Sequence, residues 1–191
     1  MIYEGQDIAC IANVANERYG WKPPVEDKFF ATDSWTNSDN IVLLQTAISD
    51  QIGNKDTVLT IPGYTEFFEK LGAEDIQVYD MSVNRLREDS SKTRHWADVS
   101  NPLIFDDLLR EAKPTALDLS NIPDHIVDKA TSNGVARTIN GCVPLKKVFV
   151  TQLLNSGGFD ELTDELVRLG WKINEYKGKG QTEKVATLQR D

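Results

Sequence analysis

The stretch that decides the fold is VLTIPGYTEFFEKLGAEDIQVYD, residues 58–80. Apolar runs at residues 57–61 and 76–79 have the length and composition of buried strands, and residues 64–71 between them carry apolar side chains at helical spacing. A strand, a helix and a second strand form the unit that builds a parallel sheet. The stretch therefore predicts one such unit, with Asp80 at the carboxyl end of its second strand.

The rest of the chain continues this alternation of helical patterns and short strand-like runs. We expect helices over residues 6–18, 38–52, 83–87, 102–111, 159–169 and from Pro123, and strands over residues 95–99, 115–119, 148–153, 171–176 and 184–188. The glycine-containing segment KGKGQTE joins the last two strands as a hairpin. These elements predict an α/β fold: a doubly wound, mostly parallel sheet of about seven strands that ends in an antiparallel hairpin, with helices on both faces.

The length of 191 residues is enough for one well-buried core. We therefore expect a single domain over residues 1–191. Within it, residues 40–191 form a Rossmann-like core, and residues 1–39 form an appendage made of a helix and an irregular segment. In sheets of this class, ligands bind at the carboxyl ends of the central strands, where the strand order reverses.

Charge and composition exclude several classes of partner. A formal charge of −9 argues against an extended surface for nucleic acid. No apolar run approaches the roughly 20 residues that a membrane span needs, so no membrane partner is expected. Cys10 and Cys142 are enough for one bridge but too few for a disulfide scaffold, and we interpret both as reduced thiols in a cytoplasmic setting.

Sequence motifs exclude several kinds of chemistry. The chain has no P-loop, no G-x-G-x-x-G fingerprint, no G-x-S-x-G elbow and no zinc-ligand pattern, so no metal site is expected. Trp21, Trp35 and Trp96 have two interpretations, either stacking on a ligand ring or filling core volume.

A closing antiparallel hairpin on an otherwise parallel seven-stranded sheet resembles the class I S-adenosylmethionine-dependent methyltransferases, and the resemblance covers residues 40–191. It implies S-adenosylmethionine as the cofactor and methyl transfer as the reaction. In that family the first strand ends in a loop of the form D-x-G-x-G. Here Thr60 stands in place of the acid, and only Gly63 of the glycines is present.

The resemblance assigns the methionine portion of the cofactor to the turn made of Ile61, Pro62, Gly63 and Tyr64. Glycines in such a turn allow the backbone to approach a ligand closely and to adopt a positive φ, which Pro62 cannot do. The turn is therefore a degenerate form of the cofactor loop.

Two acids fit the nucleoside end of the cofactor. Asp80 lies 17 residues after Gly63, close to the spacing of about 20 at which a carboxylate reaches ribose hydroxyls. Asp98 follows the third expected strand, where the resemblance implies a contact with the adenine amino group. The alternative for Asp80 is a turn or helix cap before Ser82.

Ser120 and Asn121 follow the fourth expected strand, and the resemblance implies that this segment faces the methyl acceptor. An Asn amide there can hold a nucleophilic amine or hydroxyl in line with the sulfonium carbon. The alternative is that Ser120 or Asn121 caps the helix that Pro123 opens.

Two hypotheses of function follow. The first is an S-adenosylmethionine-dependent methyltransferase that acts on an unknown acceptor. The second is a non-catalytic methyltransferase-like binding or partner protein with a vestigial cofactor site, and the degenerate turn is its main support. A third option, that the sheet holds another nucleotide or no small ligand, follows because fold does not fix function.

Overall fold

The strands of the described chain form one seven-stranded sheet in the order β3-β2-β1-β4-β5-β7-β6 in the computed structural model. Their bounds are β1 (Thr57–Thr60), β2 (Asp75–Asp80), β3 (Thr93–Trp96), β4 (Ala116–Leu119), β5 (Lys147–Leu153), β6 (Lys172–Lys177) and β7 (Glu183–Gln189). Neighbours among β1 to β5 pair in parallel, whereas β7 pairs antiparallel with both β5 and β6. The predicted doubly wound sheet with a closing antiparallel hairpin is therefore confirmed.

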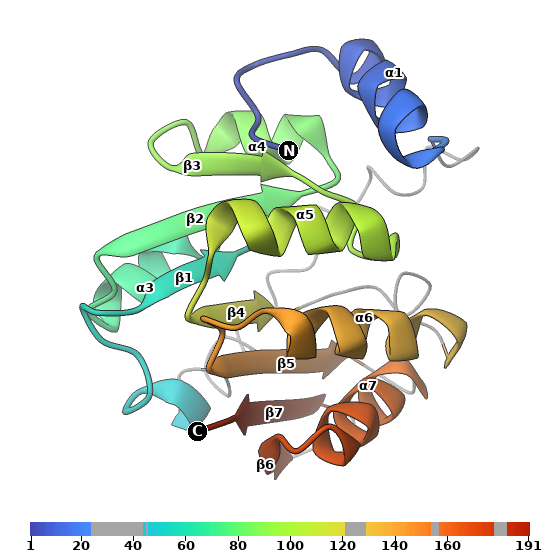
Figure 1. The fold of residues 1–191 in the computed structure, drawn as a ribbon. Helices are drawn as coiled ribbons and strands as arrows, with labels where there is room; N and C mark the ends of the chain where they lie inside the picture. The colour runs from blue at the N-terminus through green and yellow to red at the C-terminus, as the bar shows by residue number, and fades with distance from the viewer. Residues whose placement is uncertain (24–43, 45, 121–128, 154–156, 178–182) are drawn as a thin grey trace.

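The structure describes residues 1–23, 44, 46–120, 129–153, 157–177 and 183–191. The helices with described bounds are α1 (Ile8–Tyr19), α3 (Thr65–Lys70), α4 (Val83–Glu88), α5 (Pro102–Ala112), α6 (Lys129–Gly141) and α7 (Gly157–Arg168). Helices α5, α6 and α7 cover one face of the sheet, and α3 and α4 lie on the other (Figure 1). Helices on both faces were predicted, and this prediction is confirmed.

Local sequence explains where these helices begin and end. Asp7 caps α1 by accepting a hydrogen bond from the backbone N–H of Cys10 (2.7 Å), and Gly20 ends the helix with a φ of 65°. Asn101 caps α5 in the same way, with Pro102 as the first helical residue, as the sequence predicts.

One strand differs from its predicted position. The sequence predicts a strand over residues 95–99, but β3 comprises Thr93–Trp96. Its register explains the shift, because β3 pairs with β2 from Gln77 opposite Thr93 to the last pair, Asp80 with Trp96. Since β2 ends at Asp80, residues 97–99 have no strand beside them and form the loop that follows β3.

Three other predicted segments fall partly outside the described residues. The helix expected from Pro123 begins there, and its described part, α6, extends to Gly141, well beyond the apolar residues that predicted it. The helix expected over residues 38–52 is seen as helical residues 44 and 46–48. Most of the irregular segment predicted over residues 21–39 also lies outside the described residues.

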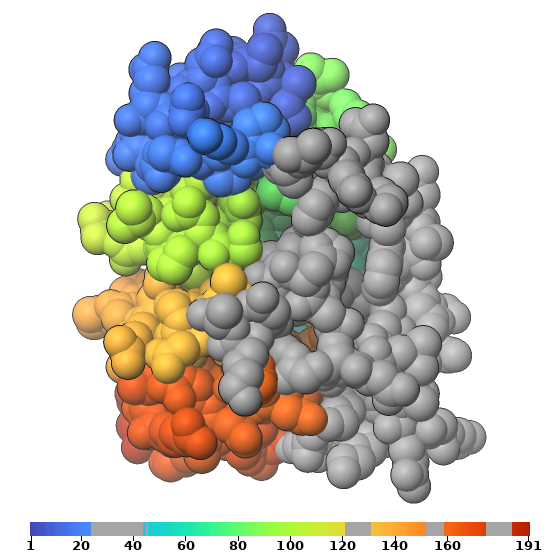
Figure 2. Space-filling model, turned by 90° about the vertical axis from the view of Figure 1, so that its right-hand side faces the viewer, coloured from blue at the N-terminus to red at the C-terminus, as the bar shows by residue number. Residues whose placement is uncertain are grey.

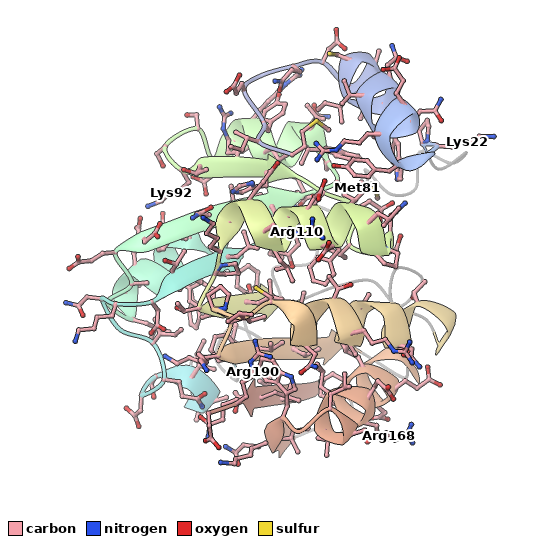
Figure 3. All side chains as sticks on the ribbon, viewed as in Figure 1. Lys22, Met81, Lys92, Arg110, Arg168 and Arg190 are labelled. Atoms are coloured by element: carbon pink, nitrogen blue, oxygen red, sulfur yellow. The ribbon has the colours of Figure 1, made fainter. Side chains whose placement is uncertain are left out.

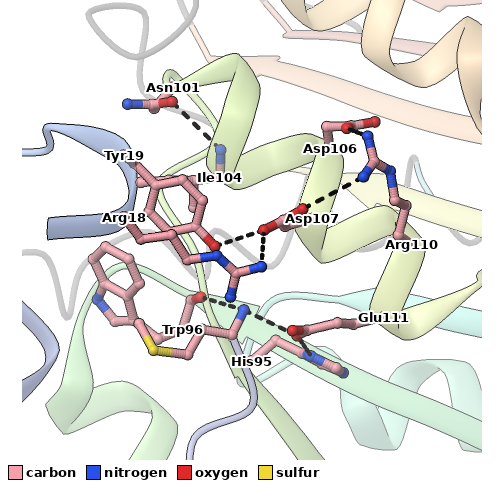
Figure 4. Close-up of polar contacts among 11 residues, drawn as sticks. Arg18, Tyr19, His95, Trp96, Asn101, Ile104, Asp106, Asp107, Arg110 and Glu111 are labelled. Carbon is pink, nitrogen blue, oxygen red and sulfur yellow. Dashed lines mark hydrogen bonds and ion pairs between the residues drawn. The ribbon is translucent and has the colours of Figure 1, made fainter. Parts of the chain in front are cut away.

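The N-terminal residues pack onto the β3 edge of the sheet. Ile2 forms an antiparallel bridge with His95, and α1 contacts α5 through Asp107, which accepts a 2.7 Å hydrogen bond from the Tyr19 hydroxyl and pairs with Arg18 at 2.7 Å (Figure 4). Burial and the Asp107 carboxylate raise the pKa of Tyr19 to about 12. Residues of the predicted appendage thus contact the core, and the single-domain assignment remains a prediction.

Apolar side chains from both faces form one buried core. Its largest fully buried side chains include Trp96, Tyr64, Phe68, Phe105 and Phe149. Among the described residues, no helix is both long and apolar enough to cross a membrane.

Candidate functional site

The candidate site lies at the carboxyl ends of β1, β2 and β4. The chain runs outward from β1 to β2 and β3, and it then crosses back to β4 on the other side of β1, so the strand order reverses between β1 and β4. Figure 3 shows Met81, directly after β2, on this side of the molecule and Lys92, directly before β3, on the opposite side. Figure 2 views the molecule from this side. Along its left border, from top to bottom, lie α1 (blue), α5 (yellow-green), α6 (orange) and α7 (red-orange).

The turn after β1 is a Pro-Gly β-turn. The N–H of Tyr64 donates to the carbonyl oxygen of Ile61 (3.3 Å), Pro62 occupies the second position, and Gly63 occupies the third with a φ of 93°. This combination is typical of a type II turn. Ile61, Pro62 and Tyr64 are buried, and only Gly63 is exposed. At this turn, the backbone around Gly63 is therefore the part that a ligand can contact.

A buried carboxylate that sequence reasoning missed connects β1 to β4. The Thr60 hydroxyl donates to Asp118 Oδ2 at 2.6 Å, while Asp118 Oδ1 accepts hydrogen bonds from the hydroxyl and the N–H of Ser120, the latter at 2.9 Å. Burial raises the pKa of Asp118, and the hydrogen bonds from Ser120 and Thr60 oppose that rise. The signal in the sequence was an acid within the apolar run ALDL.

Ser120 was predicted to face the methyl acceptor. The structure instead places it fully buried, with its hydroxyl bonded to Asp118. Its predicted neighbour in that role, Asn121, lies outside the described residues, as does the alternative in which either residue caps a helix at Pro123.

Asp80 lies at the carboxyl end of β2, next to β1, as predicted. Its Oδ1 accepts the N–H of Ser82 (2.7 Å), and its Oδ2 lies 3.4 Å from Nε of Arg85. Burial raises the pKa of Asp80, while Arg85 and the N–H groups of Ser82 and Met81 act in the opposite direction. The bond from Ser82 also satisfies the turn role that the sequence offered as an alternative.

Asp98 lies in the loop after β3. The N–H of Ala97, the residue before it, donates to the carbonyl oxygen of Asp80 (3.1 Å), which brings this loop close to the end of β2. Oδ2 of Asp98 accepts the indole N–H of Trp21 (2.6 Å), and Oδ1 accepts two hydrogen bonds from Ser100. The carboxylate predicted to read adenine thus binds a side chain from the N-terminal segment.

The tryptophans described at this end are part of the core. Trp21 and Trp96 are buried and pack edge to face, with ring centroids 5.0 Å apart, which matches the core-filling interpretation. Trp35 lies outside the described residues. No group of three or more His, Cys, Asp or Glu side chains suited to a metal ion occurs in the part of the chain that the structure describes.

No protein-family model matches the sequence, and no curated protein matches it significantly. Solved structures do match: the methyltransferase domain of a bacterial Hen1 protein superposes with a TM-score of 0.58 at 9% identity and covers 80% of this chain and 97% of that one.

Two further methyltransferases give similar values. An O-methyltransferase family protein from Burkholderia thailandensis has a TM-score of 0.56 at 11% identity, over 80% of this chain and 58% of that one. The N-methyltransferase NodS from Bradyrhizobium japonicum has a TM-score of 0.52 at 9% identity, over 83% and 97%. The chain has the class I methyltransferase fold. At these identities the similarity establishes the fold alone.

The structure brings several of the predicted site residues to the same edge of the sheet. The turn at Gly63 and the carboxylates of Asp80 and Asp98 all lie at the carboxyl ends of β1, β2 and β3. Ser120 lies at the end of β4 but is enclosed.

Proposed function

We propose that this domain binds S-adenosylmethionine at the carboxyl ends of β1 and β2 and transfers its methyl group to an acceptor. One observation carries the proposal: the Asp80 carboxylate lies at the end of the strand beside β1, partly exposed, on a fold shared with methyltransferases. A carboxylate at this position can accept hydrogen bonds from both hydroxyls of a ribose.

The other residues fit the cofactor to different degrees. The exposed backbone at Gly63 suits the methionine portion, since a positive φ and the missing side chain allow close approach. Asp98 would turn toward adenine only after exchanging its bond to Trp21. Ser120 would act by holding the end of β4 in place, because it is buried and both its hydroxyl and its N–H are bonded to Asp118, and Asn121 stays the proposed acceptor contact.

When bound, S-adenosylmethionine would supply an electrophilic methyl group: the acceptor lone pair would form the new bond to carbon, the C–S electron pair would stay on sulfur, and the acceptor would release a proton. The contribution of this chain is positioning, because such a displacement mainly requires the acceptor to be aligned with the C–S bond. We further infer a cytoplasmic setting from the cysteine content, since Cys10 and Cys142 are too few for a disulfide scaffold.

Isothermal titration calorimetry with S-adenosylmethionine and S-adenosylhomocysteine tests the proposal. We expect both to bind, and Asp80→Asn to weaken both by about 10-fold to 100-fold, because hydrogen bonds to a charged acceptor are lost. Asp75→Asn is the matched control, since it removes an exposed carboxylate at the opposite end of the same strand. Absence of heat for both ligands at millimolar concentration would overturn the proposal, and equal affinities for Asp80→Asn and wild type would overturn the assigned ribose contact.

A second function, ligand binding without methyl transfer, is favoured by a specific observation. The side chains of Asp98 and Ser120 are both fully engaged within the chain, by Trp21 and by Asp118. Incubation with methyl-labelled S-adenosylmethionine and a panel of protein, nucleic acid and small-molecule acceptors distinguishes the two. Binding with no labelled product would support the non-catalytic partner protein.

A further inference from the structure

Arg85 connects the two parts of the candidate site. From α4 its Nε lies 3.4 Å from Oδ2 of Asp80, and its Nη2 donates to the carbonyl oxygen of Pro62 at 3.2 Å. A single guanidinium thus spans from the β1 turn to the acid that ends β2. These are the two places to which the methionine and ribose portions of the cofactor are assigned.

The existing partners of the Asp80 carboxylate, the N–H of Ser82 and the guanidinium of Arg85, occupy positions that ribose hydroxyls would need. Oδ1 of Asp80 is directed at the N–H of Ser82, so Oδ2 is the oxygen left for ribose, and Arg85 faces that oxygen. Among the described residues, Glu88 repels the Asp80 carboxylate and Arg85 is the cation that offsets its charge. A ribose diol at Asp80 therefore competes with Arg85.

We propose that Arg85 is a latch on the nucleoside position: it closes the site by bridging Asp80 and the Pro62 carbonyl, and a ligand with a free ribose diol must displace it. This inference rests on the proposed function. The latch can open through its own side chain, because Arg85 is 32% exposed and long enough to turn into solvent without movement of α4.

The guanidinium also selects among ligands. Displacement from Asp80 leaves a cation beside the turn, where it can pair with an anionic group of the ligand. A nucleoside that carries a carboxylate, such as S-adenosylhomocysteine, satisfies both Asp80 and the released Arg85. Adenosine has the same diol without the carboxylate, so it satisfies Asp80 alone.

Calorimetry with S-adenosylhomocysteine and adenosine on wild type and Arg85→Gln tests the latch. We expect Arg85→Gln to bind adenosine about fivefold to tenfold more tightly, because the competing ion pair with Asp80 and the charged hydrogen bond to Pro62 are removed. The gain for S-adenosylhomocysteine should be smaller, since its carboxylate loses a cation. Salt should strengthen adenosine binding to wild type but not to Arg85→Gln, because it screens the ion pair.

Arg87→Gln is the control, since Arg87 lies on the same helix but bonds to the Tyr3 hydroxyl, away from the turn. If wild type binds and Arg85→Gln binds adenosine no more tightly, the latch is wrong while the proposed function stands. The same conclusion follows if Arg87→Gln gives an equal gain. If neither wild type nor Arg85→Gln binds any adenosyl ligand, the proposed function itself is overturned. Binding by Arg85→Gln alone supports the latch, whereas the absence of binding by wild type overturns the proposed function.

Discussion

The hydroxyl of Thr60 lies 2.6 Å from Oδ2 of Asp118, across the paired strands β1 and β4. Thr60 is the residue that stands where the methyltransferase resemblance expects an acid. The carboxylate in this structure comes instead from the adjoining strand, and it is fully buried. The end of β1 is therefore bonded to β4 through side chains, at the point where the strand order reverses.

Asp118→Asn should change how stability depends on pH. Because burial raises its pKa in the folded protein, Asp118 favours folding most at a pH below its ordinary value of 3.8, and this contribution is lost as pH rises through the folded pKa. The neutral amide does not titrate, so the stability of Asp118→Asn relative to wild type should increase as pH rises from the ordinary value of 3.8 through the folded pKa of Asp118. Urea unfolding across that range measures the change.

The Thr60 variants provide a control for this prediction. Thr60→Val removes a donor to Asp118, which raises its folded pKa further and should enlarge the loss of stability with rising pH. Thr60→Ser keeps the hydroxyl and should behave like wild type. A stability difference between Asp118→Asn and wild type that does not vary with pH would contradict the prediction.

Gly63→Ala should destabilise the turn after β1 through its backbone alone. A Cβ at this position would meet no heavy atom within 4 Å, but the φ of 93° is one that alanine rarely adopts. We expect a loss of about 1 kcal/mol in the free energy of unfolding. Gly53→Ala, equally open but without a positive φ, should be close to neutral. Equal losses for both variants would show that φ is not the cause.

Trp21→Phe should weaken the attachment of the N-terminal segment to the loop after β3. The change removes the indole N–H that donates to Asp98 at 2.6 Å and reduces the edge-to-face contact with Trp96. We expect the free energy of unfolding to fall by about 1–2 kcal/mol, as measured by urea denaturation. Tyr19→Phe removes only a half-buried hydrogen bond to Asp107 and should cost less. A larger loss for Tyr19→Phe would contradict the ranking.

The sequence predicted the elements well because their signals are local. Apolar spacing located α3 and β2 to within a residue or two, and the glycines of the segment KGKGQTE predicted the hairpin that closes the sheet. The end of β3 was wrong by three residues, because a strand ends where its partner ends and not where its own apolar run does.

The partners of the site residues depend on contacts between distant parts of the chain. Trp21 and Asp98 are 77 positions apart, and Thr60 and Asp118 are 58 apart. No local pattern indicates such pairs. Arg85 is only five residues from Asp80, yet its bond to Pro62 depends on how α4 packs beside the β1 turn. The positions of the acids were therefore predictable, whereas their availability to a ligand was not.

Lys147→Met should lower stability most near neutral pH. Asp56, before β1, accepts two 2.9 Å hydrogen bonds from Lys147 at the start of β5, at the edge opposite the candidate site. Burial alone would raise the pKa of Asp56, but hydrogen bonds from Lys147, Gly53 and Thr115 outweigh it and lower the pKa. The resulting stability is present above the ordinary value of 3.8 and is lost as pH falls through the lower folded pKa.

We therefore expect Lys147→Met to lose about 1–2 kcal/mol at about pH 7, since the pair is mostly buried, and the deficit to shrink as pH falls below 3.8. Urea unfolding at several pH values gives the comparison. Lys146→Met is the matched control, because the neighbouring amine is exposed and donates to the backbone carbonyl of Asp191. A deficit of the same size at every pH would mean that Lys147 acts through packing of its aliphatic stem, because a lost methylene contact does not titrate, whereas a lost ion pair does.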